Sequence, residues 1–208
     1  MMNIHYLFNI ILVSILFTAC TDESPTKVLI QPYGDIDPEL VIEAQNSITN
    51  TYGFHVYVAD NIKLPSQAFI NVKSPRYRAD SLLRFQKRNK PDTVDFVIGL
   101  TNKDISTSKR DHDGNILSPA WKYQDWGVFG LGYRPGCSSI VSTFRLHGLN
   151  RAHLIERLRK VFNHELGHNL GLKHCDHGEH CVMRDAAETI KTVDFVSDTL
   201  CNYCKGRL

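Results

Sequence analysis

The sequence has no block of like charges and no low-complexity tract. Its 24 Lys and Arg residues are spread along 208 residues with 22 Asp and Glu residues, which leaves a net charge of +2. Nucleic-acid-binding proteins concentrate positive charge on one face, so this composition predicts no nucleic-acid partner. With 42% hydrophobic and 22% charged residues, the chain is typical of one globular domain, which we expect to be a monomer.

The sequence also lacks an apolar run long enough to span a bilayer comfortably. The apolar stretch Tyr6–Ala19 is shorter than the roughly 20 residues that a spanning helix needs, and it fits a secretory signal. Because Leu16–Cys20 (LFTAC) resembles a bacterial lipobox, residues 1–20 are predicted to be a signal peptide with Cys20 as the lipidation site. Residues 21–26 would be a tether, and lipid would anchor an exported protein to the periplasmic or surface face of a bacterial cell membrane. A plain signal peptide or an uncleaved anchor, with Cys20 incidental, is the alternative.

Helix and strand patterns alternate along the rest of the chain. Asp37 and Pro38 begin one helix, and Asn150 caps a long one. This alternation predicts an α/β (α+β) fold with a mainly parallel sheet and helices packed against it. Strands are expected at 27–32, 54–58, 95–101, 126–133 and 138–146, helices at 37–52, 74–89 and 151–170, and a long loop at 103–125.

The long helix carries the motif His164-Glu165-Leu166-Gly167-His168. Histidines at i and i+4 lie about 40° apart on one helix face, so both imidazoles can reach one metal ion. Glu165 lies beside them as a candidate general base. Two fixed nitrogen ligands, a water position and a nearby base are what zinc-dependent hydrolysis requires.

A third ligand is expected from the residues that follow the helix. Gly171 can end the helix and turn the chain sharply, which would bring His174 back to the same ion. The full pattern is HExxHxxGxxH. Glu188 is a rival third ligand, because some zinc peptidases use a downstream Glu. The alternative for the whole motif is an amphipathic core helix with surface histidines.

The pattern HExxHxxGxxH resembles that of the metzincin metallopeptidases, whose second mark is a methionine in a turn beneath the zinc. Met183 is available for that role. Four cysteines surround it in the sequence, at positions that suit a structural Cys₄ zinc site. They are Cys175, Cys181, Cys201 and Cys204.

The complete string, HExxHxxGxxHC followed by CxM and CxxC, resembles the archaemetzincins. Segments 127–131 and 141–146 also resemble the family's strands ahead of the zinc helix. The resemblance implies a compact domain over 27–208, with a twisted mixed sheet of about five strands and one antiparallel edge strand. It implies an upper part, 27–170, and a small C-terminal lobe, 171–208. Carried over by position, His164, His168 and His174 would bind a catalytic zinc, Glu165 would be the base, Met183 would be the turn methionine, and the four cysteines would bind a second zinc.

Export leaves other states open for the cysteines. In an oxidising compartment Cys175–Cys181 and Cys201–Cys204, or cross-pairs between them, could be disulfides. His177 and His180 could also replace cysteine ligands.

Three functions remain open at the level of the sequence. The first is a zinc metallopeptidase in which Glu165 activates a zinc-bound water to cleave a peptide or protein substrate, as an aminopeptidase or an endopeptidase. The second is a non-catalytic, zinc-stabilised lipoprotein that binds a peptide or an envelope component. The third is a zinc amidase that acts on cell-wall peptides.

Overall fold

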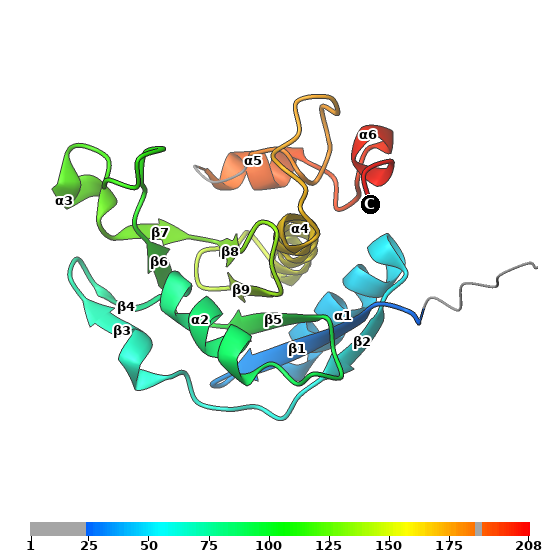
Figure 1. Cartoon of the computed structure of the whole chain (residues 1–208), viewed down its shortest axis with the longest axis horizontal. Helices are drawn as coiled ribbons and strands as arrows, with labels where there is room; N and C mark the ends of the chain where they lie inside the picture. The colour runs from blue at the N-terminus through cyan, green and yellow to red at the C-terminus, as the bar shows by residue number, and fades with distance from the viewer. Residues whose placement is uncertain (1–23, 186–188) are drawn as a thin grey trace, which may run out of the picture.

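A computed structural model of the chain describes residues 24–185 and 189–208 (Figure 1). The predicted signal peptide, Cys20 and Glu188 lie outside the described residues. Within the described ranges, no helix combines the length and the apolar character that crossing a membrane requires.

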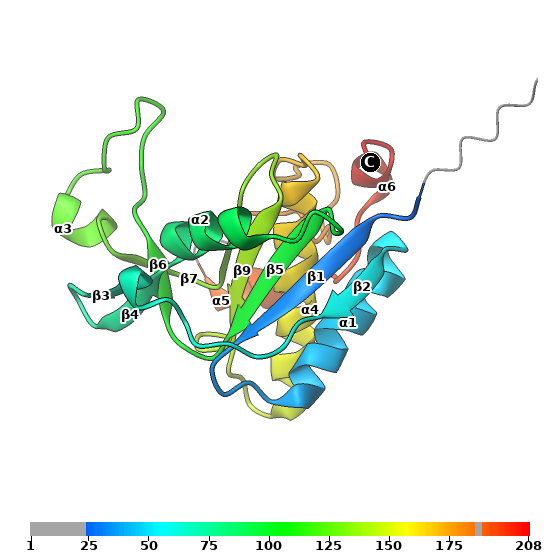
Figure 2. The ribbon, with the colours of Figure 1, turned by 60° about the horizontal axis from the view of Figure 1, so that its bottom comes forward.

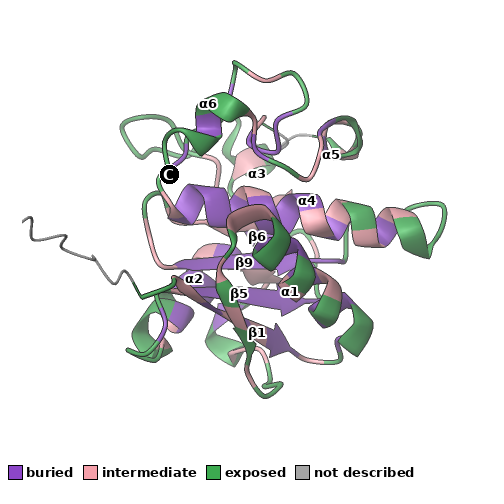
Figure 3. Cartoon of the chain, turned by 90° about the vertical axis from the view of Figure 1, so that its right-hand side faces the viewer, coloured by how far each residue is buried: buried purple, intermediate pink, exposed green. Residues whose placement is uncertain are grey.

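Five strands form the central sheet. Their order is β2 (His55–Val58), β1 (Lys27–Tyr33), β5 (Phe96–Thr101), β9 (Ser138–Ser142) and β8 (Gly130–Gly132). The first four strands are parallel, and β8 pairs with β9 in the antiparallel direction. All five residues of β9 are buried, as Figure 3 shows for the middle of the sheet. The prediction of a mixed sheet with one antiparallel edge strand is confirmed.

Helices cover both faces of this sheet. Figure 2 shows α2 (Ala79–Asn89) on one face and α1 (Pro38–Tyr52) with α4 (Arg151–Asn169) on the other. Asp37 caps α1 by accepting a hydrogen bond from the Glu39 amide, and Asn150 caps α4 in the same way from His153. Both caps are as predicted. The core between the sheet and α1 and α4 includes Ile30, Ile98, Leu158 and Phe162.

A second, four-stranded sheet was not predicted. It has the order β3 (Phe69–Asn71), β4 (Pro75–Arg78), β6 (Ile105–Thr107) and β7 (Trp126–Val128), and short helices η1 (Ser66–Ala68) and α3 (Ala120–Tyr123) accompany it. The expected helix 74–89 therefore begins only at Ala79, and the expected loop 103–125 contains a strand and a helix. The expected strand 126–133 divides between the two sheets at Phe129.

Buried ion pairs explain why this sheet was missed. Arg76 on β4 pairs with Asp104 and Asp125, and all three side chains are less than a tenth exposed. Arg145 adds a two-pronged hydrogen bond to Asp104. Charged residues in a segment usually indicate a loop, because charged side chains are mostly exposed to water. Here they are buried and pair with one another inside the protein.

The expected strand 138–146 ends early, at Ser142. The Ser142 hydroxyl donates to the Lys103 carbonyl and accepts from the Phe144 amide, so the chain turns there instead of continuing in the sheet.

The C-terminal part of the chain lies on the side of α4 that faces away from the sheet (Figures 1 and 3). It contains two short helices, α5 (Ile190–Phe195) and α6 (Asn202–Lys205). A separate small core holds it together, formed by Leu172, Val182, Met183, Leu200 and three of the cysteines. The Leu172 amide donates to the Gly167 carbonyl at 2.9 Å, which holds the start of this part against the end of α4.

Candidate metal centre

Three histidines converge where α4 ends. His164 and His168 lie one turn apart on α4, with ring centroids 4.6 Å apart. Gly171, with φ of 96°, follows the helix as predicted, and the chain returns so that the ring centroid of His174 lies 5.4 Å from that of His164 and 5.0 Å from that of His168. One nitrogen from each ring lies within 4.8 Å of the others. The predicted trio is therefore brought together.

Hydrogen bonds fix the Nδ1 atom of the two motif histidines on α4. His164 Nδ1 donates to the Val182 carbonyl and His168 Nδ1 to the Leu172 carbonyl, each at 2.8 Å. His174 Nδ1 lies 3.5 Å from a carboxylate oxygen of Asp185. A carbonyl oxygen only accepts, so Nδ1 carries the proton and Nε2 keeps its lone pair. This tautomer is the one that a metal ion needs, and the three histidines fit a zinc ion on that ground.

The electrostatic environment keeps the first two histidines neutral. Burial, together with the charge of His168, lowers the pKa of His164 to about 3. Burial also lowers the pKa of His168 to about 4, and the positive charges of His174 and Arg134 act in the same direction. Neutral imidazoles are the form that binds a metal.

Glu165 lies between α4 and the edge strand β8. Its side chain is buried, and this burial raises the pKa of its carboxyl group to about 8. A Cβ at Gly130 would lie 2.6 Å from Glu165 Oε1, and a Cβ at Gly132 would lie 2.8 Å from the Glu165 carbonyl oxygen. Only glycines at these two positions let β8 pass so close to the candidate base.

Met183, the predicted turn methionine, is fully buried and lies against the zinc-motif end of α4. A Cβ at Gly167, inside the HELGH motif, would lie 2.3 Å from Met183 Sδ. The Cys175 amide donates to the Met183 carbonyl at 2.8 Å, which joins the turn that carries Met183 to the residue after His174. The absence of a side chain at Gly167 therefore leaves the space that Met183 occupies.

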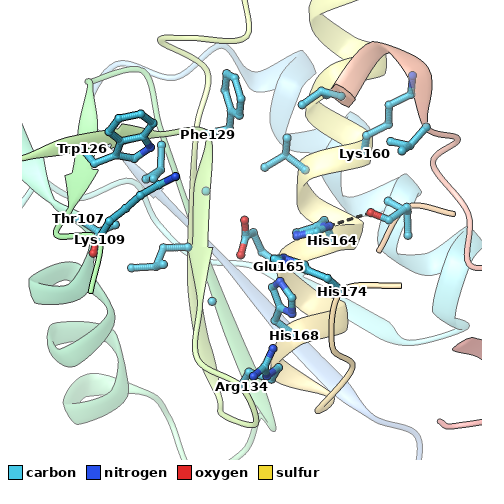
Figure 4. A pocket seen from close by; sticks show the side chains of 18 residues that line it. Thr107, Lys109, Trp126, Phe129, Arg134, Lys160, His164, Glu165, His168 and His174 are labelled. Atoms are coloured by element: carbon cyan, nitrogen blue, oxygen red, sulfur yellow. Dashed lines mark hydrogen bonds between the residues drawn. The ribbon is translucent and has the colours of Figure 1, made fainter. Parts of the chain in front are cut away.

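A cleft of about 370 Å³ opens over the histidines (Figure 4). Strands β7 and β8 form one wall, α4 forms the floor, and residues of the C-terminal part form the other wall. Most of its lining is apolar or backbone, as in other small-molecule and peptide sites. Its larger apolar side chains include Trp126, Phe129, Val161, Val193 and Val196, and its lysine and arginine side chains are Lys109, Arg134 and Lys160.

The four cysteines form a second, closed cluster. Their sulfur atoms lie within 4.8 Å of one another, and Cys175–Cys201 and Cys181–Cys204 are 3.7 and 3.8 Å apart. A regular tetrahedron with zinc–sulfur bonds of about 2.3 Å has sulfur–sulfur edges of about 3.8 Å. The cluster therefore fits a Cys₄ zinc site.

Neither nearby histidine belongs to this cluster. The ring of His177 stacks on Tyr203, and His180 Nδ1 contacts the Phe195 carbonyl at 3.0 Å. The geometry therefore does not favour either histidine as a replacement for a cysteine ligand.

Three features of the site were missed from the sequence. Asp185 gave no signal, because nothing local connects it to His174. The Gly-Leu-Gly spacing of Gly130 and Gly132 was a usable signal, since residues two apart on a strand face the same side. Asn169 gave no such signal, because its Nδ2 donates to the carbonyls of Tyr133 and Ser138, far along the chain, and so ties the end of α4 to the turn after β8.

Comparison with known proteins gives one family. The model of peptidase family M54 matches residues 39–208. Archaemetzincins from Haloquadratum walsbyi and Halobacterium salinarum are each 31% identical to the chain over 188 residues, which is 86% of this chain and 97% of each relative.

Solved structures agree with this result. Archaemetzincin from Methanopyrus kandleri aligns with a TM-score of 0.70 at 28% identity, over 90% of this chain and 95% of its own. Archaemetzincin from Archaeoglobus fulgidus, complexed with malonate, aligns with a TM-score of 0.69 at 25% identity, over 88% and 100%. The chain belongs to peptidase family M54, with the archaemetzincins, and it is a zinc metallopeptidase.

Proposed function

We propose that His164, His168 and His174 hold the catalytic zinc and that Glu165 is the general base of peptide-bond hydrolysis. The observation that carries this proposal is the convergence of one ring nitrogen from each of three histidines beside the buried carboxyl group of Glu165 in an open cleft. A zinc ion bound there would activate a water molecule and polarise the carbonyl of the substrate.

The protein's own groups divide the remaining work. Glu165 takes the proton of the attacking water and later gives it to the nitrogen of the departing amine. Its position under β8, between Gly130 and Gly132, keeps it in contact with the cleft and shields it from bulk water. Strand β8, at the edge of the sheet, offers backbone groups with which an extended peptide can pair.

We also propose a second, structural zinc at Cys175, Cys181, Cys201 and Cys204, which gives two zinc ions per chain. The sulfur–sulfur distances support this assignment. If export leads to oxidation instead, the four sulfur atoms are close enough to one another for disulfides, and the cross-pairs Cys175–Cys201 and Cys181–Cys204 are among the possible pairings.

For the leader we keep the proposal of export and lipid anchoring at Cys20, which makes a cell membrane a partner. It rests on the lipobox-like sequence alone. A Cys20→Ala variant is expected to move the protein from the membrane fraction to the soluble fraction of its host.

The test of the peptidase assignment compares wild type, Glu165→Gln and chelator-treated wild type on a library of peptides. We expect chelation to abolish cleavage and Glu165→Gln to lower it by about 10²- to 10⁴-fold while the zinc content is unchanged. Cleavage that survives Glu165→Gln would reject Glu165 as the base. Peptide binding without cleavage by the wild type would favour the non-catalytic binding function, and activity confined to cell-wall peptides would favour the amidase.

A further inference from the structure

The cations that line the cleft are not equivalent. Lys160 is buried, and its Nζ donates to Glu156 Oε1 at 2.6 Å and to the Asp194 carbonyl at 3.1 Å. Lys109 lies with its Nζ 4.3 Å from the centre of the Trp126 ring. The charge of Lys160 is therefore neutralised within the protein, and that of Lys109 is held over an aromatic face.

Arg134 differs from both. It is exposed at the end of the cleft nearest to His168 (Figure 4), and its side chain makes no hydrogen bond or ion pair with any residue in the described ranges 24–185 and 189–208. Its charge still reaches the site, since it acts on His168. Glu165, the candidate base, is the only acidic side chain among the described residues that line the cleft.

The backbone of Arg134 is fixed on both sides. The carbonyl of Tyr133 accepts a hydrogen bond from Asn169 Nδ2 at 2.9 Å, and the Gly136 amide donates to the Asn169 carbonyl at 3.1 Å. Asn169 is the last residue of α4, so the turn that carries Arg134 is fastened to the helix that carries His168. A guanidinium group on an anchored turn loses less freedom on binding than one on a free loop.

The direction of β8 determines which part of a bound peptide would lie beside Arg134. Strand β8 runs toward Arg134, and antiparallel pairing is the commoner arrangement for an added strand. A peptide that pairs with β8 in this way lies with its N-terminal part beside Arg134 and its C-terminal part beside Trp126. Given the rise of about 3.4 Å per residue, Arg134 lies within about three residues of the bond that Glu165 serves.

We propose that Arg134 is a specificity-determining residue that binds a carboxylate on the N-terminal side of the scissile bond. The substrate class is peptides with Asp or Glu within three residues before the cleaved bond. This inference rests on the proposed peptidase function of the same cleft. A guanidinium fork pairs with a carboxylate through two parallel hydrogen bonds, which a lysine cannot match.

The test uses the full-length, zinc-loaded protein and peptide sets that differ only by Glu, Gln or Lys at each of the three positions before the cleaved bond. For wild type we expect kcat/KM for the best Glu peptide to exceed that for its Gln counterpart by about tenfold. Arg134→Gln should remove this preference, and Arg134→Glu should reverse it in favour of Lys. Arg88→Gln, a charge-matched change at an exposed residue of α2, should leave it intact.

A second readout does not depend on turnover. In the Glu165→Gln background, the fluorescence anisotropy of labelled Glu and Gln peptides should show the same difference in binding, and it should shrink as salt is raised. Two results would overturn the proposal and leave the peptidase function untouched. One is equal kcat/KM for Glu and Gln peptides in wild type with equal binding in the Glu165→Gln background, and the other is a preference for Glu that persists in Arg134→Glu. Failure of the peptidase function itself would be seen separately, as the absence of any chelator-sensitive cleavage of peptides by the wild type.

Discussion

The histidine cluster ends at His174 and the cysteine cluster begins at the next residue, Cys175, yet the two clusters have opposite surroundings. The histidines line an open cleft, and His174 is exposed. Three of the four cysteines are buried, and none lines that cleft. An open site with three nitrogen ligands leaves space for water and substrate, whereas a closed site with four sulfurs leaves none. The histidine cluster therefore suits a catalytic metal, and the cysteine cluster suits a metal that stabilises the fold.

The largest expected effect is a loss of stability when the cysteine cluster is disrupted. Cys204→Ser should remove the structural zinc and lower the free energy of unfolding by more than about 4 kcal/mol, because the small C-terminal core depends on it. Urea unfolding with metal analysis would measure it. Cys137→Ser, at a half-buried cysteine outside the cluster, is the control and should change little. Full stability and two retained zinc ions in Cys204→Ser would contradict the closed-site assignment.

The opposite result is expected at the open site. His174→Ala should lower kcat/KM by about 10³-fold or more, since it removes a metal ligand, while the cysteine cluster keeps its zinc and the fold. Circular dichroism and zinc content would check this, with a fall from two zinc ions to one. If His174→Ala unfolds the C-terminal part, the two sites are not separable.

Gly167→Ala tests the packing of Met183, which lies between the histidine motif and the cysteine cluster. The new methyl group would collide with Met183 Sδ, so we expect the free energy of unfolding to fall by about 1–3 kcal/mol. Gly206→Ala is a matched control, because the nearest atom to its added Cβ would be 3.5 Å away. Thermal melts of both variants would separate crowding at Met183 from a general effect of losing a glycine.

Gly130→Ala acts on the open site alone. It should push β8 away from Glu165 and lower kcat/KM by about tenfold, with a smaller change in stability than Gly167→Ala, because β8 is an edge strand. Steady-state kinetics beside thermal melts would measure both. Wild-type kinetics in Gly130→Ala would show that the close approach of β8 is not needed.

The smallest effect, about 1 kcal/mol for each pH unit, is a pH dependence of the metal-free protein. His164 and His168, with lowered pKa values, stay neutral in the fold, so stability is lost as pH falls below about 6.5, where the unfolded chain takes up their protons. Glu165, with a raised pKa, keeps its proton in the fold. It therefore costs stability as pH rises from about 4.5 to about 8.

Glu165→Gln isolates the second contribution. Wild type should lose stability relative to this variant by about 1 kcal/mol per pH unit between about pH 5 and 8. Thermal melts of metal-free protein across that range would show it. A constant difference between the two proteins would mean that the carboxylate keeps an ordinary pKa.

The sequence predicted the elements that follow local rules. Asp37 and Asn150 cap their helices, Gly171 ends the turn, and the three histidines meet because helical spacing and one glycine determine their geometry. The second sheet could not be predicted, since Arg76 and Asp104 are charged residues whose burial depends on partners far along the chain. The same holds for Asp185, whose contact with His174 depends on the tertiary fold.

The single peptide link between His174 and Cys175 restricts how this protein can change by insertion and deletion. An extra residue at that link would displace a ligand of each cluster at once. The next turn contains four exposed residues that belong to neither set of ligands, namely Asp176, His177, Glu179 and His180. A residue gained or lost in 176–180 would leave this link intact, but it would change the spacing between Cys175 and Cys181, in a turn where a Cβ at Gly178 would already lie 2.7 Å from Cys201 Cβ.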